Sequence, residues 1–261
     1  MKHHETGIDF NQPAQHRPRL GLIALASDVL VERDFWRMGL AAGVDIVTTR
    51  IAQSMPLTPA TLARLEDGIP DAVRLLLPDA PLDAIVFACT SGSAIIGPQK
   101  VAEQIAALRP GVAITNPATA AVEALKHLGC RRIVFIAPYT EDVAEITSGV
   151  FAEAGIGFSD RLCFGLTSDV QIATPGLAHY RRAIAQADIA TADAIFLSCT
   201  TAATLDLIAP LEAETGLPVI TSNQAAFWHA LRCMGHTPSM AGFGTLFSQP
   251  RHRPAAHRAG S

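Results

Sequence analysis

The chain has 261 residues, of which 49% are hydrophobic, 17% are charged and only 6% are aromatic, and its formal net charge is −4 at pH 7. Such a weakly acidic chain has no basic patch for nucleic acid or for an anionic membrane surface. Its first 18 residues contain no apolar core of the length that a signal peptide needs, so we expect none, and no apolar run approaches the ~20 residues of a membrane span. Five cysteines without a CxxC pair argue against a disulfide framework and a structural zinc site. We therefore expect a cytoplasmic protein that binds small molecules.

The chain begins and ends in polar segments, 1–18 and 247–261, which we expect to be disordered tails. Between them, short runs that are apolar throughout alternate with helical patterns, which indicates parallel sheets with crossover helices. In chain order we expect a strand at 20–26, a helix at 58–77, a strand at 84–88, a helix at 98–108, a strand at 112–115, a helix at 117–128, a strand at 133–137, helices at 141–154 and 176–187, a strand at 194–198, a helix at 203–215, a strand at 218–221 and a helix at 223–234.

An internal repeat organises this pattern. The segment DAIVFACTSGSA at 83–94 matches DAIFLSCTTAAT at 193–204, at an offset of 110 residues. Two further blocks match in the same order at offsets of 106 and 112 residues, namely 112–129 with 218–235 and 19–25 with 131–137. The repeat predicts an α/β fold with two lobes, 19–129 and 130–246, related by a pseudo-twofold axis, each with a mostly parallel sheet flanked by helices.

Cys89 and Cys199 occupy matching positions in the repeat, each directly after a predicted strand. Ligands of open α/β sheets bind outside the carboxyl ends of the strands, so the duplication predicts two thiols facing one cleft. We expect a helix to begin shortly after each cysteine. Backbone N–H groups and the helix dipole at such a turn lower a thiol pKa and can hold a substrate carboxylate. Gly92 would let the backbone approach a ligand closely.

Two thiols on opposite faces of one carbon suit stereochemical inversion, in which one removes a proton and the other delivers one. Alternatively, a thiolate adds to an alkene, the resulting single bond rotates, and elimination gives the other isomer. Neither scheme needs a cofactor, and the sequence has no Walker loop, no complete GxGxxG and no GxSxG. The histidines form no HxH or HExxH group, so we expect no metal site.

Several other polar residues have simpler explanations. The charged residues at 32–34 are expected to be a solvated first helical turn. Asn116 and Asn223 follow the two VIT-type strands; either could line the cleft, but N-capping of the next helix is the favoured interpretation. The remaining cysteines have no repeat partner and are expected to be structural: Cys130, Cys163, in the possible strand RLCFGL, and Cys233.

The segments FACTSGSA and LSCTTAAT, each opening a Cys-Thr-small loop, resemble the aspartate/glutamate racemase superfamily, and the resemblance covers about 19–246. Within it the chain is most similar to the branch containing maleate cis–trans isomerase, arylmalonate decarboxylase and the ectoine-utilisation protein. The segments LGLIALASDVLVERDF, IAPYT and CTSGSAIIG look most like the ectoine-utilisation member.

The resemblance implies roles for particular residues. Cys89 and Cys199 would be the catalytic pair. In the decarboxylases of this branch the first cysteine position is glycine, so the presence of both thiols favours racemisation or isomerisation. The resemblance also implies a substrate-binding set that holds the carboxylate and its developing enolate, made of Thr90, Ser91, Thr200 and the substrate-bonding tyrosine, Tyr139.

Asp28 and Asp169 depart from the maleate isomerases, which have asparagines at these positions. Two added negative charges would disfavour a dianionic substrate and favour one that carries an amine or a partly masked charge. Asp28 could instead hydrogen-bond near Cys89. Both residues could also simply cap helices or form turns.

The sequence thus predicts a cofactor-independent racemase or cis–trans isomerase that acts on a small carboxylate, with a role in ectoine degradation as one form of this hypothesis. A decarboxylase of malonate-like acids is an alternative, and a non-catalytic protein that binds a small ligand is another. We expect a homo-oligomer that binds neither nucleic acid nor membranes.

Overall fold

The computed structural model describes residues 17–248. The tails expected at 1–18 and 247–261 therefore lie outside the described residues, apart from positions 17–18 and 247–248. At the C-terminal end, Phe247 belongs to a short helix, α12 (Thr245–Ser248), and is buried beside the rings of Phe227 and Phe243. The core therefore extends through Phe247, because this aromatic side chain is packed rather than solvated.

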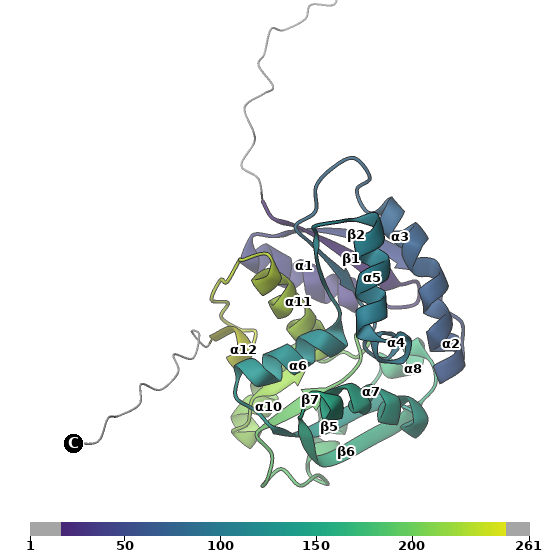
Figure 1. Cartoon of the computed structure of the whole chain (residues 1–261). Coiled ribbons are helices and arrows are strands. Elements are labelled where there is room, and N and C mark those ends of the chain that lie inside the picture. The colour runs from purple at the N-terminus through teal and green to yellow at the C-terminus, as the bar shows by residue number, and fades with distance from the viewer. Residues whose placement is uncertain (1–16, 249–261) are drawn as a thin grey trace, which may run out of the picture.

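Two four-stranded parallel sheets form the frame of the molecule (Figure 1). The first has the order β2-β1-β3-β4 and consists of β1 (Arg19–Leu25), β2 (Asp45–Ile51), β3 (Ala84–Phe87) and β4 (Ala113–Thr115). The second has the order β6-β5-β7-β8 and consists of β5 (Arg132–Tyr139), β6 (Gly157–Leu166), β7 (Ala194–Leu197) and β8 (Val219–Thr221). The second order repeats the first strand for strand, which confirms the predicted fold class of two related α/β lobes.

Helices flank both sheets. Those of the first half are α1 (Val31–Ala42), α2 (Pro59–Ala63), the 3-10 turn η1 (Arg64–Gly68), α3 (Ile69–Leu75), α4 (Thr90–Ile96), α5 (Pro98–Leu108) and α6 (Pro117–His127). Those of the second half are α7 (Glu141–Glu153), α8 (Asp169–Ile172), α9 (Leu177–Ile184), the 3-10 turn η2 (Leu205–Leu207), α10 (Ile208–Thr215) and α11 (Ser222–Cys233).

The repeated DAI motif explains how each central strand is fixed in its sheet. Every residue of β3 (AIVF) and of β7 (AIFL) is buried, as expected for strands covered on both faces. The aspartate before each strand accepts backbone N–H bonds from the neighbouring strand: Asp83 from Arg19 at 2.7 Å, and Asp193 from Arg132 at 2.8 Å. One sequence motif therefore sets the start of the central strand in both lobes.

The two halves exchange helices at their interface. Helix α6, from the first half, packs against α11 and also contacts β8 of the second sheet. Helix α11, from the second half, packs against β3, β4 and α1 of the first (Figure 1). Most residues of α11 are buried all around the helix, which is typical of a helix enclosed in a core. Each lobe is thus completed by a helix from the other.

One edge strand of each sheet, β2 in the first and most of β6 in the second, was missed by the sequence pattern. Strand β2 was not predicted, because DIVTTRI mixes polar and apolar residues, and β6 extends well beyond the RLCFGL segment. The helix expected at 58–77 is divided into α2, η1 and α3. Within residues 17–248, no helix is both long enough and apolar enough to span a bilayer.

Candidate active site

Cys89 and Cys199 lie just beyond the carboxyl ends of β3 and β7, which are equivalent inner strands of the two sheets. The loops that carry them meet, since the hydroxyl of Thr200 donates to the backbone carbonyl of Ala88 at 3.3 Å. The thiols are 4% and 8% exposed. The charge of Cys89 raises the pKa of Cys199, so the two buried cysteines lie near each other where the loops meet.

The Cys89 loop continues directly into a helix. Cys89 is the N-cap of α4, and its Sγ accepts the backbone N–H of Gly92 at 3.2 Å; the Oγ of Ser91 is 3.9 Å from the same sulfur. A Cβ on Gly92 would lie 2.9 Å from Cys89 Sγ and 2.9 Å from Leu65 Cδ1. Glycine is therefore required here because the sulfur occupies the space of a side chain.

The Cys199 loop has a different backbone. Cys199 has a φ of 90°, in the left-handed region that non-glycine residues rarely adopt. A turn follows instead of the expected helix, and regular structure resumes only at η2. The expected helix thus begins immediately at Cys89, whereas after Cys199 the helix expected at 203–215 is delayed to η2 and α10, because a left-handed residue turns the chain out of the helical direction. A residue held in this conformation by its surroundings is typical of functional sites.

Burial dominates the ionisation of both thiols. It raises the pKa of Cys89 to about 12, although the N–H of Gly92 and the hydroxyl of Ser91 act in the opposite direction. Burial also raises the pKa of Cys199 well above its ordinary value, with further increases from Asp169, Cys89 and Asp28. Both thiols are therefore protonated at neutral pH, and reaction requires a thiolate that is stabilised when substrate binds.

The residues implied to bind the substrate lie around the two thiols. Tyr139, at the end of β5, is buried, and its hydroxyl shares a hydrogen bond of 2.5 Å with Ser198 Oγ. Burial raises the pKa of Tyr139, and so do nearby Cys199 and Cys89. Thr90 begins α4, and its hydroxyl donates to Ser222 Oγ of α11 at 2.8 Å. The bond of Thr90 joins the two lobes, and the bond of Tyr139 joins the ends of the neighbouring strands β5 and β7. Both hydroxyls are therefore held in fixed positions.

Asp28 and Asp169 are buried beside the same site. Asp28 follows β1, and its Oδ1 accepts the backbone N–H groups of Leu30 and Val31 at 2.8 and 2.9 Å. Asp169 is the first residue of α8, and its Oδ2 accepts a short hydrogen bond from Ser27 Oγ. Burial raises the pKa of Asp169, and the charge of Asp28 raises it further. The structure therefore places both carboxylates near each other and near both thiols.

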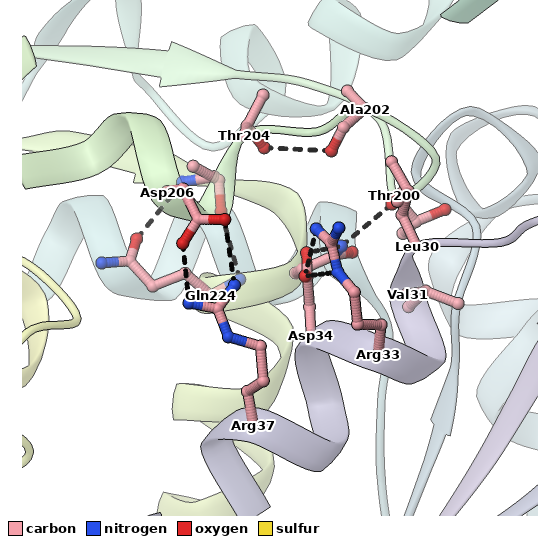
Figure 2. A network of polar contacts seen from close by, with 12 residues as sticks. Leu30, Val31, Arg33, Asp34, Arg37, Thr200, Ala202, Thr204, Asp206 and Gln224 are labelled. Carbon is pink, nitrogen blue, oxygen red and sulfur yellow. Dashed lines mark hydrogen bonds and ion pairs between the residues drawn. The ribbon is translucent and has the colours of Figure 1, made fainter. Parts of the chain in front are cut away.

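A second polar network, missed by the sequence reasoning, supports the Cys199 loop (Figure 2). The side-chain amide of Asn223 donates to the backbone carbonyl of Thr200 and to Asp34 Oδ2, both at 2.9 Å. Asp34 is fully buried, and Arg33 and Asn223 are its partners. The expectation of a solvated turn at 32–34 was wrong for Asp34, because this face of α1 packs against α11.

The two repeat-related asparagines also differ. Asn116 is the N-cap of α6 and accepts the N–H of Thr119 at 3.0 Å, as expected. Asn223 is not a cap, because Thr221 caps α11 and leaves the Asn223 amide to bind the Cys199 loop. The only sequence signal for this role was the position of Asn223 after a strand end. Tyr180 was missed as well; it is fully buried, and its pKa is raised by burial and by Cys199.

A family model described as arylmalonate decarboxylase matches residues 55–247. The chain belongs to this family. The maleate isomerase of Pseudomonas putida is 27% identical over 190 residues, which are 70% of this chain and 76% of the relative. The arylmalonate decarboxylase of Bordetella bronchiseptica is 32% identical over 142 residues, which are 53% and 59% of the two chains. Both reactions are thus represented among its relatives.

The fold of the arylmalonate decarboxylase family is shared by solved maleate isomerases. One structure of Nocardia farcinica maleate cis–trans isomerase, a cysteine-to-serine mutant with a covalently bound succinylcysteine intermediate, superposes with a TM-score of 0.81 at 24% identity. The likeness covers 89% of this chain and 99% of that chain. It identifies the fold as that of the aspartate/glutamate racemase type.

Metal ligands do not gather in the part of the chain that the structure describes: residues 17–248 hold no group of three or more His, Cys, Asp or Glu side chains able to bind an ion. The other cysteines lie apart from the site, with Cys130 buried and Cys163 and Cys233 exposed.

Proposed function

We propose that this protein is a cofactor-independent racemase or cis–trans isomerase that acts on a small carboxylate through Cys89 and Cys199. The observation that carries the proposal is that two buried cysteines follow equivalent strands of the two lobes, on loops that contact each other. One substrate carbon bound between them would be approached from two sides. The maleate isomerases among the relatives and the structural neighbour with a succinylcysteine support cysteine chemistry of this kind.

In the racemase form, one cysteine is a thiolate and the other a thiol. The thiolate takes the proton from the substrate carbon, the electron pair passes into the adjacent carboxylate, and the thiol delivers its proton to the opposite face. The enzyme ends with the two protonation states exchanged, and no proton is gained or lost overall. Hydroxyl and backbone N–H groups around Thr90, Ser91 and Thr200 would stabilise the developing enediolate.

In the isomerase form, a thiolate forms a sulfur–carbon bond with the alkene, and the double-bond electrons move towards the neighbouring carboxylate. Rotation about the new single bond follows, the electrons return, and the sulfur–carbon bond breaks to give the other isomer. The same carboxylate-binding groups serve both forms, so the site geometry is compatible with either reaction.

The first test replaces each thiol in turn. Cys89→Ser and Cys199→Ser should each lower turnover by about 10³-fold or more, because proton transfer or nucleophilic attack is lost. Cys163→Ser is the matched control, since Cys163 is exposed on β6 and outside the site. Circular dichroism and melting temperature should be unchanged in all three variants. Full activity in either site variant would overturn the proposal.

Deuterium incorporation separates the two forms. A racemase working in heavy water incorporates deuterium at the reacting carbon, whereas addition, rotation and elimination need not exchange a substrate hydrogen. Proton NMR of the recovered substrate therefore distinguishes them. Ectoine-degradation genes beside the coding sequence would favour the ectoine-pathway form of the proposal, and nicotinate-degradation genes would favour maleate.

Decarboxylation is the second candidate, favoured by the family match over residues 55–247 and by the Bordetella bronchiseptica relative. One thiol suffices to protonate the carbanion left by loss of carbon dioxide, so this reaction leaves one of the two cysteines without a role. Release of carbon dioxide from an arylmalonate, retained in Cys89→Ser, would decide for the decarboxylase. Tight binding of a carboxylate without any chemical change would instead indicate a ligand-binding protein.

A further inference from the structure

Two buried carboxylates beside the thiols are not explained by the cysteine chemistry. Asp28 is fully buried, and its Oδ1 accepts two backbone N–H bonds, whereas its Oδ2 is buried without any hydrogen-bond partner among the described residues. A buried carboxylate oxygen left unpaired is costly, so a native protein keeps one where something binds to it. Capping explains one oxygen of Asp28 and leaves the other available for a ligand.

Asp169 approaches the same place from the other lobe. It is 3% exposed, and its partner Ser27 precedes Asp28 in the chain. A backbone bond from Leu57 N to Thr167 O, at 2.8 Å, ties the first lobe to the segment just before α8. The Asp28 and Asp169 side chains are therefore held together by a contact between lobes, and they form a rigid pair of negative groups.

Acidic groups lie near the two thiols. Asp169 and Asp28 both raise the pKa of Cys89 and that of Cys199. The guanidinium of Arg50 lies beside Asp28, but it donates to the backbone carbonyls of Leu25 and Asp28 and to the carboxylate of Glu32. The aspartate pair is thus not neutralised by an arginine or lysine of its own.

The hydroxyls of Ser27 and Thr201 donate to Asp169, so the unpaired oxygen of this cluster belongs to Asp28. The Ser27 hydroxyl lies 3.2 Å from Gln53 Oε1 as well as within bonding distance of Asp169, yet it has a single hydrogen to donate. Gln53 Nε2 is buried without a hydrogen-bond partner. If the nitrogen and oxygen of this amide are exchanged, Nε2 donates to Ser27 Oγ and Oε1 is left unpaired instead. In that arrangement, two buried acceptor oxygens, Asp28 Oδ2 and Gln53 Oε1, have no donor among the described residues.

We infer that Asp28 and Asp169 form the subsite for a protonated amine, and that the substrate is a small carboxylate that carries an ammonium group. An ammonium brings three N–H donors and one positive charge, which match the unpaired oxygen of Asp28 and the negative charge of the pair. The substrate carboxylate would occupy the N–H and hydroxyl groups that follow Cys89 and Cys199. This inference rests on the proposed function for the reacting groups and adds the charge of the substrate.

The first experiment measures the charge of the site without requiring turnover. Cys89 and Cys199 are modified with a cationic reagent, 2-aminoethyl methanethiosulfonate, and with its anionic counterpart, 2-sulfonatoethyl methanethiosulfonate, and peptide mass spectrometry gives the rate at each thiol. The cationic reagent should react faster by about tenfold or more, since two carboxylates attract it and repel the other. Equal rates, or a faster anionic reagent, would overturn the inference.

Variants then assign the effect to the pair. Asp28→Asn and Asp169→Asn should each reduce the cationic preference severalfold; asparagine keeps an acceptor oxygen for the bonds to Leu30 and Val31, so the fold is preserved. Asp206→Asn is the matched control, because Asp206 is an exposed aspartate paired with Arg37. A loss of preference as large in the control as in the site variants would contradict the assignment to Asp28 and Asp169.

The second experiment compares substrates. Wild-type enzyme in heavy water is given small carboxylates with an amine, such as L-aspartate and L-2-aminobutyrate, and carboxylates without one, maleate and phenylmalonate. Turnover confined to amine-bearing acids, with KM raised at least tenfold in Asp28→Asn, supports the inference. Turnover of maleate or phenylmalonate alone would overturn it while leaving the cysteine mechanism intact. Amine-bearing acids converted equally well by Cys89→Ser and Cys199→Ser would instead overturn the proposed function.

Discussion

The Cys89 and Cys199 loops come from one repeated motif, yet they differ in structure. The Cys89 loop enters α4 at once, and its sulfur accepts the N–H of Gly92. The Cys199 loop passes through a left-handed residue and is held from outside by Asn223. Duplication has therefore preserved the position of the sulfur but not its hydrogen-bonding environment. Two thiols in unlike environments are suited to unlike parts of a reaction, with one more readily ionised than the other.

The largest loss of turnover should come from disturbing the contact between Gly92 and Cys89 Sγ, which has no counterpart in the Cys199 loop. Gly92→Ala places a methyl group 2.9 Å from Cys89 Sγ, so the sulfur must move. We expect turnover to fall by about 100-fold, as small displacements of a reacting group commonly cause. Gly149→Ala, in the helix α7, is the control, since its Cβ would meet open space. Steady-state kinetics of both variants test the comparison, and a fully active Gly92→Ala would show that this close approach is dispensable.

The next largest effect should come from removing the Asn223 side chain, which holds the Cys199 loop through its bond to the Thr200 carbonyl. Asn223→Ala should cost about 2 kcal/mol of unfolding free energy, because it leaves buried Asp34 without its amide partner. It should also change the alkylation rate of Cys199 severalfold while leaving Cys89 unaffected. Asn116→Ala is the matched variant at the repeat-related position, where loss of a helix cap costs about 1 kcal/mol and neither thiol should respond. Equal changes at both thiols in Asn223→Ala would contradict the positioning role.

The ionisation of the thiols provides a third comparison. Burial raises the pKa of Cys89 to about 12 and that of Cys199 well above its ordinary value, and the charge of Asp169 raises both further. Only thiolates react with iodoacetamide, so labelling of both should rise about tenfold per pH unit from pH 7 to pH 10. At each pH, Cys89 should react faster than Cys199, because the Gly92 N–H and the Ser91 hydroxyl stabilise its thiolate while the charge of Cys89 further raises the pKa of Cys199. Faster labelling of Cys199 would reverse the assigned order.

The smallest effect should come from the surface pair between the lobes, Arg37 of α1 and Asp206 of η2. Arg37→Gln should destabilise the protein by about 0.5 kcal/mol, as is usual for exposed ion pairs. Arg37 lowers the pKa of Asp206 in the folded state. The contribution is therefore present above the ordinary aspartate pKa and is lost as the pH falls through the lowered value. Urea unfolding should show a larger difference between wild type and Arg37→Gln at pH 7 than at pH 3.

The sequence predicts the frame of this fold well, because the inner strands are apolar throughout and the repeat fixes their order. It fails at β2, where Thr48, Thr49 and Arg50 interrupt the pattern; an edge strand needs no continuous apolar run. The two thiols were also predictable, since their shared position in the repeat is visible in the sequence.

The surroundings of the thiols were not predictable in the same way. The bond from Asn223 to Asp34 joins residues 189 positions apart, and no local pattern signals it. The left-handed backbone of Cys199 is set by packing, since cysteine has no preference for that region. The sequence suggested a charge effect for Asp28 and Asp169 but left capping as an equal alternative. The structure shows that capping occupies only one oxygen of Asp28.

The exchange of α6 and α11 limits how this enzyme can admit its substrate. A hinge opening that moved the lobes apart as rigid bodies would pull α11 from β3 and β4 and expose a helix that is buried on nearly every side, including the apolar residues Phe227, Trp228 and Leu231. At roughly 25 cal/mol per Å² of apolar surface, that motion is too costly to accompany each catalytic cycle. Passage to the thiols must instead come from local movement of the loops at the strand ends. Sequence changes in those loops, rather than at a hinge, should therefore set how quickly substrate enters and product leaves.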